Sequence, residues 1–328
     1  MLQQLRPSER DGGGVKNSKK FAIISVVVGT VLAVGCLYFV IKQVADGWND
    51  YGDQISAARW GWLILALPLA TAGMTMLSLV WRNVIEALGQ KASLRDVFVW
   101  YQIGNLGKYI PGGVLQILGR SELAVRGGVT RSVAYNSVAL SMGATYIAGG
   151  LVSAVLLPFV LLERGHIGNT WWVFLVIPIG FAALHPKILG KMFTIAEKAF
   201  GGADEKVVPP WITSVKLVAR YAPGWVVNGL ACWVTALCFD PGAPFLTLVF
   251  AGIISWVAGF LVIFVPSGLG VREAAFVLIT SASMTSSTAA TVAIVSRLVF
   301  VLADLIGAFA ATLVRKRSKG QANEAALA

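Results

Sequence analysis

Ionisable side chains that interrupt apolar segments are the residues of this chain with the clearest potential for chemistry. A charge in such a segment is costly and usually faces the interior of a helical bundle, where it binds a ligand or pairs with another charge. A guanidinium is planar and donates parallel hydrogen bonds, so it suits a phosphate group. We predict four substrate-binding residues and two charge partners for them. They are Lys108, Arg120, Arg272 and Arg297, with Glu273 and Asp304 as the partners.

Two turns rich in proline and glycine lie beside these charges. Pro111 favours the first turn of a helix that we expect to run through Leu118, and Pro266 plays the same part later in the chain. Free amide groups at such helix starts can bind phosphate. We therefore predict that these turns line an interior site and gate access to it. Their residues are Gly107, Pro111, Gly112, Gly113, Pro266, Gly268 and Gly270.

No residue pattern in the sequence indicates catalysis or metal binding. The three cysteines, Cys36, Cys232 and Cys238, lie in apolar runs without metal-ligand spacing. His166 and His185 are far apart and lie at loop edges. No phosphate-binding loop of the G-x-x-x-x-G-K-[ST] form occurs. We predict no catalytic residue, no metal and no cofactor.

The composition is that of a membrane protein. Of the 328 residues, 56% are hydrophobic and only 13% are charged, against roughly 25% charged in soluble domains. The net charge of +11 comes from basic residues scattered in short loops and in the two tails. Such a distribution orients a chain on the anionic inner leaflet, so we do not expect nucleic acid as a partner.

Loop charges predict the topology, because Lys and Arg are retained on the cytoplasmic side. We expect cytoplasmic tails at residues 1–20 and 315–328 around one transmembrane domain, residues 21–314, in the cytoplasmic membrane. The expected apolar segments are residues 21–41, 60–80, 97–118, 132–162, 171–184, 221–239, 245–265, 274–283 and 289–314.

The segment at residues 97–118 has basic residues on both sides, so it cannot cross the membrane fully. We expect it to enter the membrane and return, and we expect the pair at residues 245–265 and 274–283 to do so from the other side. The predicted fold is therefore an all-α integral membrane protein, a polytopic helical bundle with two re-entrant helix pairs. Residues 60–162 and 221–314 would form an inverted repeat, as in many secondary transporters.

Three motifs resemble one known family. "GNLGKYIPGGVLQILGR" at residues 104–120, "FVPSGLGVREAAF" at 264–276 and "SRLVFVLADLIGAF" at 296–309 resemble the lysylphosphatidylglycerol synthase transmembrane family, the flippase-like module. The resemblance covers roughly residues 20–315. It implies a device that moves lipids with charged or sugar head groups between leaflets, and it marks the charged and turn residues named above.

The chain departs from the family at one position. Many members carry a carboxylate at about Ser141, and this chain has none there. A cationic head group would thus have one partner fewer, which favours an anionic substrate. Only about fourteen residues follow Val314, so we do not expect a synthase domain there or synthesis of the lipid by this chain alone.

These observations predict a flippase-like transporter, not an enzyme, that moves a phosphate-bearing lipid between leaflets. The lipid would be an aminoacyl-phospholipid or a polyprenyl-phosphate-linked sugar. Two alternatives stay open, a non-transporting membrane partner of a lipid or glycan synthase, and a transferase acting on a polyprenyl carrier within the membrane. A separate synthase or glycosyltransferase and a second copy of the chain also stay open as partners.

Overall fold

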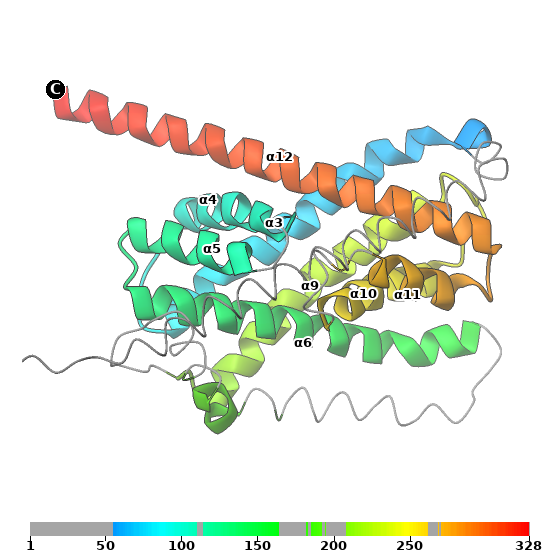
Figure 1. Cartoon of the computed structure of the whole chain (residues 1–328), viewed down its shortest axis with the longest axis horizontal. Coiled ribbons are helices and arrows are strands. Elements are labelled where there is room, and N and C mark those ends of the chain that lie inside the picture. Colours follow the sequence, from blue (N-terminus) through cyan, green and yellow to red (C-terminus); the bar gives the residue numbers. More distant parts are fainter. Residues whose placement is uncertain are drawn as a thin grey trace, which may run out of the picture.

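The computed structural model describes residues 55–109, 114–163, 182, 185–191, 194, 208–261, 268 and 270–327, with side chains as far as Lys316. Within these ranges the regular structure is entirely helical (Figure 1). The first half contains η1 (Trp60–Trp62), α3 (Leu63–Ala87), α4 (Leu94–Asn105), η2 (Leu106–Tyr109), α5 (Val114–Arg126) and α6 (Arg131–Glu163). The second half contains α9 (Trp211–Ala236), α10 (Phe245–Leu261), α11 (Val271–Thr280) and α12 (Ser286–Leu327).

Three helices in the described ranges are long and apolar enough to cross a membrane. They span Trp60–Ala87, Arg131–Glu163 and Ser286–Lys316, and so correspond to three of the expected segments. The prediction of an all-α membrane protein is therefore confirmed. The expected crossing at residues 221–239 falls on α9, a continuous helix that starts earlier and contains Arg220, Pro223 and Asn228. It is not among these three helices, so this crossing stays a prediction. The expected segments at 21–41 and 171–184 lie outside the described residues, apart from Ala182 in the latter.

The expected segment at residues 97–118 is a pair of helices. Helix α4 begins after Ser93, whose hydroxyl accepts a hydrogen bond from the Asp96 amide and so caps the helix. Helix α5 packs against α4 and continues beyond the expected end at Leu118 as far as Arg126. Its predicted start at Pro111 lies outside the described residues. Helices α10 and α11 form a second contacting pair, and re-entry of either pair into a membrane stays a prediction.

Helices α3 and α9 cross at the centre of the bundle through small residues. A β-carbon on Gly73 would lie 2.2 Å from the Asn228 amide oxygen, and one on Gly224 would lie 2.6 Å from Leu77. Small residues let helix backbones approach closely inside a membrane, where apolar burial alone does not drive association. Trp81, Tyr221 and Trp225 fill the space around this crossing and are buried.

The packing contacts between helices fall into matching sets. Helices α3 and α6 touch, as do α9 and α12; α4 touches α12, and α10 touches α6. Likewise, the contact of α5 with α6 matches that of α11 with α12. The contact of α6 with α9 matches that of α12 with α3. The contacts thus have the two-fold form that a repeat of four helices would produce. The opposite orientation of the predicted repeats across a membrane is a separate prediction.

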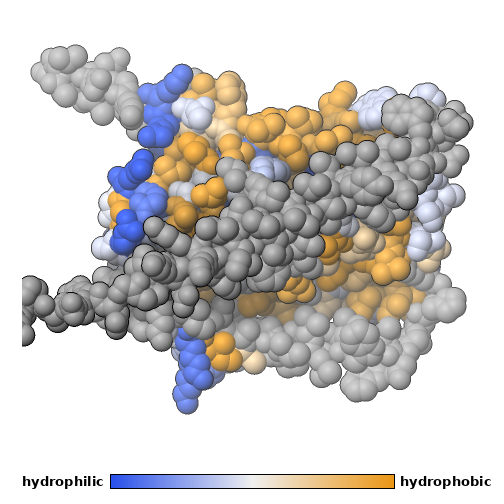
Figure 2. Space-filling model, in the orientation of Figure 1, coloured by the Kyte–Doolittle hydropathy of each residue, from blue (hydrophilic) through white to orange (hydrophobic). Residues whose placement is uncertain are grey.

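The surface of the described residues suits a lipid environment. On the face shown in Figure 2, the coloured residues between the two ends are mainly hydrophobic, and the most hydrophilic ones gather toward one end. Large side chains such as Leu298, Leu302 and Phe309 of α12 are exposed. Helix α12 also extends beyond the rest of the bundle at its C-terminal end (Figure 1).

Candidate functional site

A cavity of about 300 Å³ lies between the two helix pairs and the central helices. Its walls are mainly aromatic and apolar, with Tyr101, Tyr146, Trp225, Trp256 and Phe260 among the aromatic residues. The side chain amides of Asn105, Gln116 and Asn228 also line it. A mostly apolar wall with a few polar groups is typical of small-molecule sites.

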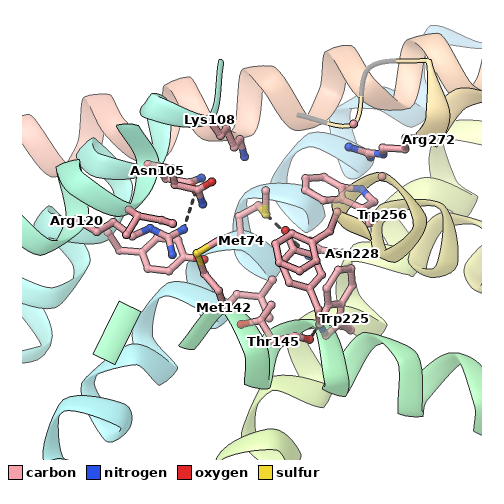
Figure 3. Close-up of a pocket in the computed structure, with 18 of the residues that line it drawn as sticks. Met74, Asn105, Lys108, Arg120, Met142, Thr145, Trp225, Asn228, Trp256 and Arg272 are labelled. Carbon is pink, nitrogen blue, oxygen red and sulfur yellow. Dashed lines mark hydrogen bonds between the residues drawn. The ribbon is translucent and has the colours of Figure 1, made fainter. Parts of the chain in front are cut away.

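Three of the four predicted substrate-binding cations line this cavity, and no carboxylate is among its lining residues in the described part of the chain. Figure 3 shows Arg120 and Arg272 on opposite sides of the cavity, with Lys108 on its rim. Lys108 comes from η2, Arg120 from α5 and Arg272 from α11. The sequence separates these residues widely, and the fold gathers them around one space.

Lys108 is the cation of this cavity whose charge is already paired. Its Nζ lies 2.6 Å from Oδ2 of Asp304 on α12, and both side chains are buried. Asp304 also accepts hydrogen bonds from Asn105 Nδ2 at 3.0 Å and from the Tyr109 hydroxyl at 2.5 Å. A buried carboxylate needs such partners, because leaving its oxygens unpaired costs several kcal/mol, roughly.

Arg120 carries a charge with no carboxylate partner in the described residues. Its guanidinium lies 3.6 Å from the centre of the Tyr101 ring and donates to Asn105 Oδ1 at 2.7 Å. Its Nε is buried and makes no hydrogen bond. Arg120 is only 2% exposed, so this buried N–H lacks the acceptor that buried polar groups usually have.

Arg272 is the second such cation. Its guanidinium lies 3.7 Å from the centre of a Trp256 ring and 5.3 Å from that of Phe300. Within the described ranges, no hydrogen bond or ion pair to its side chain is found, and the residue is 9% exposed. The stacking partly offsets the cost of burying the charge, and the N–H groups at the guanidinium edge stay available.

Arg297 does not line the cavity. It pairs with Glu273 of α11, whose other oxygen accepts a hydrogen bond from the Gly270 amide at 2.6 Å. Arg297 and Asp304 share one helix, and each pairs with a different helix pair instead of with the other. Both charge partners that we predicted are thus in ion pairs, and each pair joins α12 to a different helix pair.

The predicted turn residues lie close to the cavity where they are described. Gly268 lines it with φ +64°, and Gly270 has φ +82° immediately before α11, which is a conformation that favours glycine. A β-carbon on Gly107 would lie 2.6 Å from the Leu115 backbone, so glycine lets η2 approach the start of α5. The remaining predicted turn residues, Pro111, Gly112, Gly113 and Pro266, lie outside the described residues.

Asn105, Asn228 and the aromatic platforms Tyr101 and Trp256 are site residues that sequence reasoning missed. The two asparagines interrupt apolar segments as the charges do, so the rule used for ions could have found them. Tyr101 and Trp256 gave no signal, because an aromatic residue in an apolar segment is usually ordinary packing.

The rest of the described chain offers no obvious second chemistry. No group of three or more metal-ligating side chains occurs in it, and Cys232 and Cys238 are free and buried. Ser141 shares a 2.8 Å hydrogen bond with the Tyr221 hydroxyl and is 1% exposed.

Comparison with known proteins identifies the family. The family model described as the lysylphosphatidylglycerol synthase TM region matches residues 24–307, which include every predicted site residue. A comparison with curated proteins finds no match. Because the matched range covers most of the 328 residues, the chain belongs to the lysylphosphatidylglycerol synthase transmembrane-region family.

Proposed function

We propose that this protein is a flippase-like transporter that moves a phosphate-bearing lipid between the leaflets of the cytoplasmic membrane. The lipid head group would occupy the cavity between the two helix pairs, while its acyl or prenyl tail stays in the bilayer. The observation that carries the proposal is the cavity itself, which is lined by three cations and by no carboxylate among the described residues.

Burial of Arg120 and Arg272 without carboxylate partners supports an anionic occupant. Removing a charge from water costs several kcal/mol, roughly, unless an opposite charge or hydrogen bonds compensate it. Aromatic stacking compensates only part of this cost. An anionic head group would supply the negative charge that the two guanidinium groups lack. A neutral or cationic head group would leave both guanidinium charges uncompensated.

Translocation in proteoliposomes tests this proposal. The purified protein would be reconstituted with labelled phosphatidylglycerol, aminoacyl-phosphatidylglycerol or a polyprenyl-phosphate-linked sugar. We expect at least one probe to move, and Arg272→Ala to slow it about tenfold or more, since hydrogen bonds to charged groups contribute roughly 1.5–3 kcal/mol. Arg131→Ala is the matched control, because Arg131 is exposed outside the cavity. No movement of any probe by folded wild-type protein would overturn the proposal.

The proposed topology has its own test. Single cysteines would be introduced at Lys91, after α3, and at Thr285, between α11 and α12, in a variant without native cysteines. Both positions are exposed. If the termini are cytoplasmic and the repeat is inverted, a membrane-impermeant thiol reagent should label Thr285→Cys in intact cells. It should label Lys91→Cys only after the membrane is permeabilised. Labelling of both positions from the same side would contradict the inverted repeat.

A further inference from the structure

The first helix pair presents its arginine in a distinctive way. On α4, Tyr101 and Gly104 are three residues apart and so lie on one face of the helix. The Arg120 guanidinium stacks on Tyr101, while a β-carbon at Gly104 would lie only 2.6 Å from the Arg120 amide nitrogen. The aromatic ring supports the guanidinium, and the glycine lets α5 come close enough for it to reach the ring.

The second helix pair repeats this arrangement. On α10, Trp256 and Gly259 are again three residues apart. The Arg272 guanidinium stacks on Trp256, and a β-carbon at Gly259 would lie 3.4 Å from the Arg272 β-carbon and 3.3 Å from the Gly268 α-carbon. Each helix pair thus combines an aromatic residue and a glycine, three residues apart on its first helix, with an arginine on its second helix that stacks on the aromatic ring.

The helix contacts relate the two arrangements. Exchange α3 with α9, α4 with α10, α5 with α11 and α6 with α12. Every contact between two of these helices then becomes a contact that the structure also contains. This exchange pairs α5 with α11, so the helix that carries Arg120 corresponds to the helix that carries Arg272. Lys108 lies in η2, before the turn of its helix pair, and so is not on the helix that corresponds to α11.

The charges of the cavity indicate what it can hold. Asp304 neutralises Lys108, and Glu273 neutralises Arg297, so two positive charges stay uncompensated within the described residues. Both belong to guanidinium groups, which bind phosphate oxygens through pairs of parallel hydrogen bonds. Each guanidinium is stacked on a ring by its face, which leaves donors at its edge for a ligand.

We propose that Arg120 and Arg272 form one two-fold anion site, which selects a lipid head group bearing two negative charges on phosphate. A phosphate monoester and a diphosphate both have this chemistry. A singly charged phosphodiester would leave one guanidinium unpaired, and a lysylated head group would add positive charge. This inference rests on the proposed function and narrows its substrate class.

Transport selectivity tests the inference. Proteoliposomes of zwitterionic lipid would carry a trace of labelled phosphatidic acid, polyprenyl diphosphate, phosphatidylglycerol or lysyl-phosphatidylglycerol. We expect at least one of the first two to move about tenfold faster than the last two, as one additional charge-assisted contact would give. The ratio between phosphatidic acid and polyprenyl diphosphate then distinguishes the monoester from the diphosphate.

Conservative variants show whether both arginines make the selection. Arg120→Lys and Arg272→Lys keep the charge and lose the paired hydrogen bonds, so each should bring the selectivity ratio close to one. Arg131→Lys is the matched control, because this guanidinium also lies over a tyrosine ring, that of Tyr135, but is exposed and paired with Glu122. It should leave the ratio unchanged.

The outcomes separate the inference from the proposed function. Transport without preference, or with a preference that only one arginine affects, would overturn the two-fold site and leave the flippase proposal intact. If no probe moves, thermal stabilisation of the detergent-solubilised protein by pyrophosphate decides the matter. Stabilisation that both lysine variants lose would support the site without transport, and no stabilisation of wild-type protein would overturn it.

Discussion

Replacing Asp304 with alanine should destabilise the folded protein by about 3–5 kcal/mol, the cost of leaving one member of a buried ion pair without its partner. The variant would leave the Lys108 ammonium buried with no opposite charge in contact. It would also remove the acceptors that the Asn105 amide and the Tyr109 hydroxyl use. Unfolding by increasing denaturing detergent in mixed micelles would measure the loss.

Two controls isolate the buried pair as the cause. Glu86→Ala breaks the Arg82–Glu86 pair, whose side chains are 39% and 36% exposed, and should cost at most about 1 kcal/mol. The double variant Lys108→Met/Asp304→Leu removes both buried charges and should recover much of the lost stability, because the desolvation cost disappears with them. A loss in Asp304→Ala no larger than in Glu86→Ala would contradict a buried, charged pair.

The ion pairs show what the sequence can and cannot supply. Charges inside apolar segments are identifiable directly, because burying them has a cost that only function or pairing offsets. Arg297 and Asp304 are seven residues apart on α12, which is about 10 Å along the helix axis, so they do not pair with each other. Their actual partners, Glu273 and Lys108, are 24 and 196 residues away in sequence, and only the packing of the helix pairs on α12 brings them together.

The equivalence of Arg120 and Arg272 was less accessible to sequence reasoning. The two Pro-Gly turns suggested a repeat, but the repeat differs in the aromatic residue that supports each arginine, Tyr101 in one half and Trp256 in the other. Both rings offer a face to a guanidinium, but an aromatic residue in an apolar segment is usually ordinary packing, so neither one stands out in the sequence. The cavity depends on close helix approach, and composition and hydropathy carry no information about that distance.

Replacing Glu273 with alanine should have the second large effect. The folded protein should lose about 3 kcal/mol or more of stability, because two groups lose their partner at once. Arg297 would lose its ion-pair partner, and the Gly270 amide at the start of α11 would lose its acceptor. Glu273→Gln keeps an acceptor for that amide and removes only the charge, so its loss should be smaller. Adding Arg297→Met to Glu273→Gln should then restore part of the stability.

Amide hydrogen exchange can show whether each ion pair stabilises only its own helix pair or the whole bundle. Because Glu273 lies on α11 and Asp304 bonds η2, amide hydrogen exchange should accelerate in α10 and α11 for Glu273→Ala, and in α4, η2 and α5 for Asp304→Ala. Helix α12 would then hold each helix pair by a separate ion pair of opposite polarity, so either pair could loosen alone. Equal acceleration throughout the bundle in both variants would show instead that the two pairs act as one cooperative unit.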